Sequence, residues 1–142
     1  MATNLTTPSL PARVLLEDKT EVRLVPITRT GHPLYVSRDG RVFSFVHGMC
    51  RRLKPHNDTT PNSRYNSGRK QRYLKLSTRH SNILIHQAVL YAWVGPPPEG
   101  YECDHLNGIT TDNRLENLEW VTQAENQRRA KILREERKQL NH

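Results

Sequence analysis

The chain has 142 residues, which is enough for one compact domain with extensions and too few for two full-sized domains. Only 35% of the residues are hydrophobic and 6% are aromatic, so we expect a modest apolar core. A formal net charge of +8 favours a polyanionic partner such as nucleic acid, although a solvated basic surface would have the same composition.

Two classes of protein are disfavoured by simple sequence features. The chain has no apolar run long enough to span a bilayer and no secretory pattern at its start, so we expect a cytoplasmic protein without membrane segments. Its two cysteines, Cys50 and Cys103, form no CxxC pair, which argues against a four-thiolate zinc site. We predict that both are free thiols.

The first half of the chain predicts β structure. Residues 1–13 are rich in Thr, Ser and Pro and are predicted to form a flexible tail, and residues 14–28 give no clear periodicity. Residues 34–45 alternate on both sides of an Asp-Gly turn signal, which is typical of a β-hairpin. Residues 54–72 are almost wholly polar and predict a long surface loop, with four basic residues expected to contact phosphates: Arg64, Arg69, Lys70 and Arg72.

After this loop the pattern changes from strand to helix. Residues 73–77 alternate as a half-buried strand does, and residues 83–85 are expected to pair with it. Apolar residues at helical spacing predict a short helix over 86–94, which Gly95 and the three following prolines end. Trp93 and Trp120 are expected in the core, and His86 is interpreted as a structural residue at the start of the helix.

The last third combines two short apolar segments with a basic helix. Thr122 and Glu125 form a T-x-x-E capping signature, so a helix is predicted from Gln123 toward Leu140. Residues 107–113 are rich in Asn and Asp, and we interpret Asp112 and Asn113 as loop-shaping residues. The predicted fold class is therefore α+β: a small antiparallel sheet and a short helix, followed by strand, loop, strand and a basic C-terminal helix.

The segment CDHLNGITTDNRLENLEWVTQAENQRR, residues 103–129, resembles the HNH motif of phage and intron-encoded homing endonucleases, in an H-N-N form. A less specific similarity extends upstream to about residue 34. The resemblance implies a ββα fold around one divalent metal, with His105 as general base and Asn117 as the residue that orients it. It further implies Asp104 and Asn126 as metal ligands, with Asn126 also part of the catalytic set.

These residue types suit phosphodiester hydrolysis. An imidazole accepts a proton near neutral pH, and a carboxylate with an amide oxygen favours Mg²⁺ or Mn²⁺ over zinc. The resemblance also implies cleavage products with 5′-phosphate and 3′-hydroxyl ends. The implied partner is double-stranded DNA, and four further basic residues are expected to contact it: Arg114, Arg128, Arg129 and Lys131.

The resulting hypothesis divides the chain into the tail, a β-rich DNA-contacting region at 14–99 and the HNH motif with its basic helix at 100–142. Its function is predicted to be a metal-dependent DNA endonuclease. One alternative is an HNH-fold nucleic-acid-binding or regulatory protein without turnover, and a weaker one is a single-stranded RNA binder. Nicking or double-strand cleavage, and a monomer or a homodimer, remain open at this stage.

Overall fold

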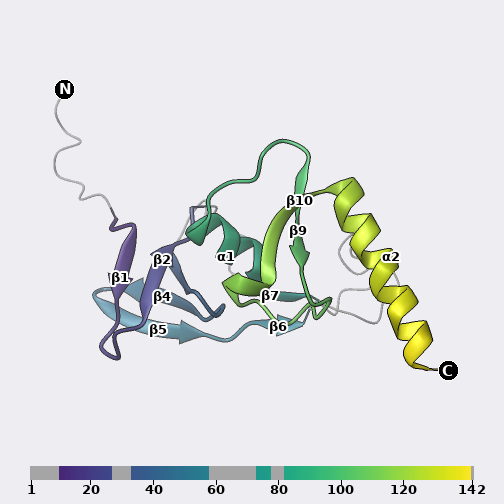
Figure 1. Cartoon of the computed structure of the whole chain (residues 1–142). Coiled ribbons are helices and arrows are strands. Elements are labelled where there is room, and N and C mark those ends of the chain that lie inside the picture. The colour runs from purple at the N-terminus through teal and green to yellow at the C-terminus, as the bar shows by residue number, and fades with distance from the viewer. Residues whose placement is uncertain (1–9, 27–32, 58–72, 78–81, 142) are drawn as a thin grey trace.

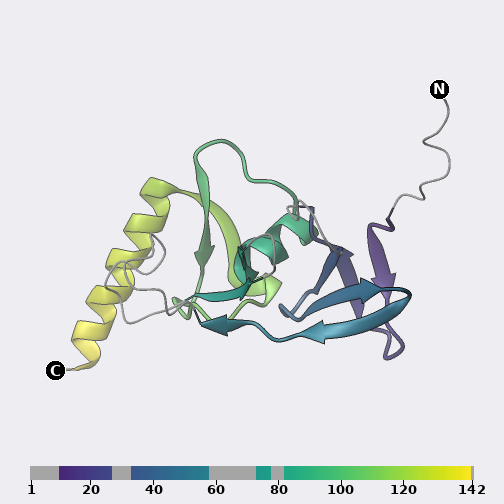
Figure 2. The same ribbon diagram turned by 180° about the vertical axis from the view of Figure 1, so that it is seen from behind.

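A computed structural model describes residues 10–26, 33–57, 73–77 and 82–141. A five-stranded antiparallel sheet forms the N-terminal half, with the strands in sequence order. Its strands are β1 (Arg13–Leu15), β2 (Glu21–Leu24), β3 (Leu34–Ser37), β4 (Val42–Val46) and β5 (Met49–Leu53). Strand β5 therefore lies at one edge of the sheet, and in Figure 2 the chain runs on from it toward the opposite end of the molecule.

A three-stranded sheet and a short helix follow. The sheet pairs β6 (His56–Asn57), β7 (Leu74–Ser77) and β8 (Asn82–Leu84), and β8 leads directly into α1 (Ile85–Trp93). Strand β6 corrects the predicted loop over 54–72, because its backbone pairs with residues 74 and 75. Backbone pairing at a sheet edge needs no apolar side chains. The polar composition of this segment therefore gave no indication of the strand. The remainder of that predicted loop, residues 58–72, lies outside the described residues.

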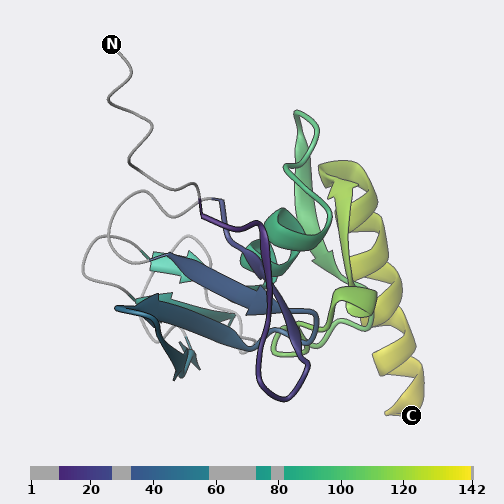
Figure 3. The ribbon, with the colours of Figure 1, turned by 90° about the vertical axis from the view of Figure 1, so that its left-hand side faces the viewer.

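The C-terminal third has the predicted ββα order. Strands β9 (Tyr101–His105) and β10 (Leu118–Thr122) form an antiparallel pair, joined by a loop that ends in the 3₁₀ turn Leu115–Asn117, and α2 (Gln123–Leu140) follows. The β9–β10 pair lies between α1 and α2 (Figure 3). The fold class is α+β, as predicted.

Alternation along the strands divides the apolar residues into two clusters. Leu34, Val36 and Val42 face α1 and join the main core, whose helix side includes Val89 and Leu90. On the opposite face of the same sheet, a smaller cluster is built from Val22, Tyr35 and Phe43. Because neighbouring strand residues point to opposite faces, this one sheet separates the two clusters.

Both tryptophans pack against the main core, as expected, and both also satisfy a polar atom. The Trp93 indole donates to the carbonyl of Val36 at 3.1 Å, and the Trp120 indole donates to the carbonyl of Gly95 at 2.9 Å. Both bonds lie at the C-terminal end of α1 and fix that end against strands β3 and β10. Figure 1 shows α1 between the five-stranded sheet and β10. Both cysteines are free thiols, as predicted.

None of the helices in the described ranges combines the length and apolar character that a bilayer crossing requires.

Candidate active site

His105 ends β9 with its side chain directed toward α1. It is 6% exposed, and its ring lies against two other rings: His86 of α1 at 4.9 Å between centroids and Tyr73 at 5.9 Å. Burial lowers the pKa of His105, while the hydrogen bond to Asn113 and the carboxylates of Asp104 and Asp112 oppose that effect. Burial of the ring therefore favours its neutral form.

One hydrogen bond to His105 comes from the loop between β9 and β10. The side-chain oxygen of Asn113 lies 2.8 Å from Nε2 of His105, and Asn113 is itself only 4% exposed. The other ring nitrogen, Nδ1, makes no hydrogen bond to the described part of the chain. Asn113 is therefore the described residue that hydrogen-bonds to this ring.

Asn117 shapes this loop. Its side chain accepts from the backbone N–H of Asn107 at 3.0 Å and donates to the side chain of Asn107 and to the carbonyl of Asp112, each at 2.9 Å. Asn107 in turn accepts from the backbone N–H of Ile109, which forms an Asx turn. Asn117 thus ties both ends of the loop together, and it is Asn113 that bonds to His105.

Asp104 points to the other face of the β9–β10 pair, toward α2. Burial raises the pKa of Asp104, and the guanidinium of Arg129, 3.2 Å from its Oδ2, opposes that shift. Glu119 lies directly across the strand pair and also contacts Arg129 at 3.2 Å, and Arg129 reaches Glu125 as well. Arg129 is therefore shared among three carboxylates, of which Glu125 also pairs with Arg128.

Asn126 lies in the first turns of α2 above the same face. Its side-chain nitrogen donates to Glu102 at 2.6 Å, so its carbonyl oxygen is directed elsewhere and accepts no hydrogen bond from the described residues. The carboxylate of Asp104 and this amide oxygen are hard donors, which fit Mg²⁺ or Mn²⁺ by their chemistry. Within the described ranges, no group of three His, Cys, Asp or Glu side chains is spaced to hold a metal, so water and phosphate would have to supply the other ligands.

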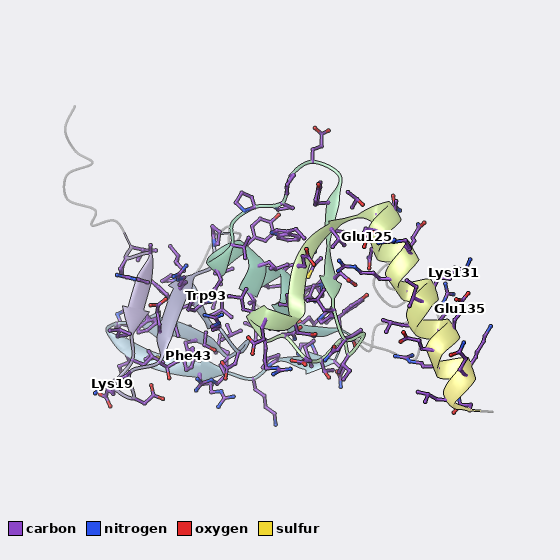
Figure 4. The ribbon with its side chains drawn as sticks, in the orientation of Figure 1. Lys19, Phe43, Trp93, Glu125, Lys131 and Glu135 are labelled. Carbon is purple, nitrogen blue, oxygen red and sulfur yellow. The ribbon has the colours of Figure 1, made fainter. Side chains whose placement is uncertain are left out.

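The described basic residues that we predicted to contact DNA differ in their ion pairs. Arg114 is paired with Asp112 and Glu116, and Arg128 with Glu125. Lys131 is exposed, has no ion pair in the described part of the chain, and points away from the β9–β10 pair (Figure 4). The other four predicted contacts, in the 58–72 segment, lie outside the described residues: Arg64, Arg69, Lys70 and Arg72.

Two residues at this site were not identified from the sequence as part of it. His86 was assigned a structural role, and it is buried, but its ring contacts His105 edge to face. Asn113 was interpreted as loop-shaping. Both carry a buried polar atom without a hydrogen bond in the described structure, Nδ1 of His86 and Nδ2 of Asn113. Neither contact had a signal in the sequence, because His86 lies at the start of an apolar helix and Asn113 lies in an Asn-rich loop.

Residues 84–128 match a family model described as HNH endonuclease. The match begins in β8 and ends in α2, so it includes the β9–β10 pair with His105, Asn117 and Asn126. The resemblance inferred from the motif is thereby confirmed for this segment.

Among curated proteins, none matches the chain. A solved structure described as DNA binding and cleavage by the HNH homing endonuclease I-HmuI is similar to it, with 26% sequence identity and a TM-score of 0.48. The match covers 68% of this chain and 49% of that one, so the similarity extends over about half of the other protein's length.

Proposed function

We propose that this chain, whose residues 84–128 match HNH endonucleases, is a metal-dependent DNA endonuclease with His105 as its general base. One observation carries the proposal: His105 and Asp104 are neighbours on β9, with their side chains on opposite faces of the strand pair. A base and a metal ligand are thereby held a fixed, short distance apart. Such fixed geometry is a main source of rate enhancement in phosphoryl transfer.

The proposed role of His105 is to take a proton from water. Nδ1 removes the proton as the water oxygen attacks phosphorus, and the bond from phosphorus to the 3′ oxygen breaks. The leaving oxygen takes up a proton from solvent, which gives 5′-phosphate and 3′-hydroxyl ends. Burial lowers the pKa of His105, so a larger fraction of it is neutral and able to act as a base at neutral pH.

We infer that Asp104 and Asn126 hold the divalent ion, Mg²⁺ or Mn²⁺, with Asn117 keeping the loop beside them in place. Such an ion, when bound, neutralises charge on the phosphoryl group and on the leaving oxygen. Arg129 contacts Asp104 in this structure, so it must share or release that carboxylate. Its release would give DNA phosphates a guanidinium beside the scissile bond.

Double-stranded DNA is the proposed substrate. Lys131 offers an ammonium group that no described carboxylate neutralises, and Arg114 and Arg128 can exchange exposed ion pairs for phosphates at little cost. We also propose that region 14–99 contacts DNA. Arg51 and Arg52 on the edge strand β5 are exposed and form no ion pair with described residues.

A second candidate has one observation in its favour. Asp104 is bonded to Arg129, and Asn126 is bonded to Glu102, so both proposed metal ligands already have polar partners. A nucleic-acid-binding protein that keeps the fold without turnover would have such an arrangement. Metal-dependent cleavage separates the two candidates.

The test uses supercoiled plasmid incubated with the purified full-length chain and Mg²⁺, Mn²⁺ or chelator. The nuclease predicts nicked or linear product with metal and intact plasmid with chelator. The variant His105→Ala should reduce cleavage by about 10²-fold or more while its affinity for duplex DNA stays within about twofold. Intact plasmid under every metal, together with normal DNA affinity, would support the binding protein.

A further inference from the structure

We propose that Asn113 is a positioning residue that holds His105 in the tautomer with its proton on Nε2, so that the lone pair able to accept a proton lies on Nδ1. The consequence for cleavage rests on the proposed nuclease function. The tautomer itself does not, because it is a property of the folded chain.

The assignment follows from the chemistry of the one hydrogen bond to this ring from a described residue. An amide oxygen only accepts, so its 2.8 Å contact requires Nε2 of His105 to donate. A neutral imidazole carries one proton, which leaves Nδ1 as the acceptor. Asn113 and His105 are 4% and 6% exposed, so water competes poorly for this bond.

The other neighbours of the ring do not select a tautomer. His86 and Tyr73 contact His105 through their ring faces and edges, and no hydrogen bond joins either of them to His105 among the described contacts. Their packing sets the plane of the ring. The choice between its two nitrogens is therefore left to Asn113.

The turn between β3 and β4 holds Asn113 in place. A Cβ atom added at Gly40 would lie 3.1 Å from Cβ of Asn113 and 3.2 Å from its carbonyl oxygen. Beside this contact, the N–H of Leu115 donates to the carbonyl of Arg38 at 2.8 Å. The five-stranded sheet therefore reaches the loop at the residue that bonds to His105, and the absence of a side chain at Gly40 permits the approach.

Nitrogen-15 NMR of the imidazole rings in the full-length chain tests the tautomer directly. At neutral pH the His105 signals, assigned by their loss in His105→Gln, should be those of the Nε2–H form, with a proton slow to exchange with water. Asn113→Leu should lose that slow proton, and Asn113→Asp, which still offers an acceptor oxygen, should keep it. An Nδ1–H form in the wild-type chain overturns the proposal, whatever the variants do.

Two glycines provide a matched pair for the loop contact. Gly40 and Gly48 both have positive φ, +91° and +77°, so alanine strains the backbone at each, but nothing lies within 4 Å of a Cβ at Gly48. Gly40→Ala should weaken or shift the slow His105 proton, and Gly48→Ala should leave it unchanged. Equal spectra from the two folded variants would overturn the role of the turn.

Cleavage kinetics then measure the consequence. Asn113→Leu should lower kcat by about tenfold or more with an unchanged KM for DNA, and Asn113→Asp should recover most of that loss. If the wild-type chain does not cleave DNA, the proposed function fails while the NMR result still decides the tautomer. A slow Nε2 proton with full cleavage by Asn113→Leu would overturn the positioning role.

Discussion

The two helices on either side of the β9–β10 pair are held in opposite ways. Helix α1 has five buried residues in nine, begins after Leu84 without a side-chain cap, and packs into the main core. Helix α2 has eighteen residues, none of which is buried, and it is held by the Thr122 cap and by ion pairs. Burial fixes α1, whereas exchangeable polar contacts fix α2.

This difference corresponds to the two halves of the candidate site. The base side, with His105 and His86, lies toward α1 and is enclosed by packed rings. The proposed metal side, with Asp104 and Asn126, lies toward α2, where ions and DNA phosphates can replace side-chain partners. We therefore expect the base side to be rigid and the proposed metal side to be adjustable.

The largest expected effect is on the packing of α1. Leu90 is 1% exposed, so Leu90→Ala should lower the free energy of unfolding by about 3 kcal/mol through lost burial and a cavity. Ile132 of α2 is 45% exposed, so Ile132→Ala should change the free energy of unfolding by less than about 0.5 kcal/mol. Urea denaturation measures both, and similar losses at the two positions would contradict the comparison.

A smaller effect is expected from pH on the base side. Burial, with a further contribution from His105, lowers the pKa of His86 from 6.5 to about 3. Between these values the unfolded chain binds a proton that folded His86 does not, so stability falls as pH falls below about 6.5. From pH 7 to about pH 5 this one residue should account for about 2 kcal/mol.

His86→Phe supplies the control, because it keeps a ring in place and removes the titrating group. Denaturation curves at the two pH values should show a shallower loss of stability in this variant than in the wild-type chain. Equal losses in both chains would mean that His86 takes up its proton over the same pH range in the folded chain as in the unfolded chain.

The smallest expected effect concerns the start of α2. The Thr122 hydroxyl accepts from the N–H of Glu125 at 3.2 Å, so Thr122→Ala should lower stability by about 1 kcal/mol. Thr122→Ser, which keeps the hydroxyl, should lose less. Because α2 carries Asn126, we also expect the alanine variant to require more metal for half-maximal cleavage. A larger loss for serine than for alanine would contradict the capping role.

Much of the fold could be predicted where short-range chemistry decides it. Gly40, with φ of +91°, completes the predicted hairpin turn, and Thr122 caps α2, which begins at the predicted residue. The reciprocal half of the capping box was not found: Glu125 bonds to Arg128 and Arg129 instead. Two neighbouring cations attract a carboxylate more strongly than one backbone N–H does.

The sequence by itself determined the ββα order and the identity of the acid, amide and imidazole groups in it, because turns, caps and alternation act over a few residues. Only the tertiary structure decided which groups meet. Asn113 reaches His105 through the fold of a loop that the turn at Gly40 supports, and Arg129 reaches Asp104 across a helix and a strand. Such contacts depend on packing between elements, which no local pattern encodes.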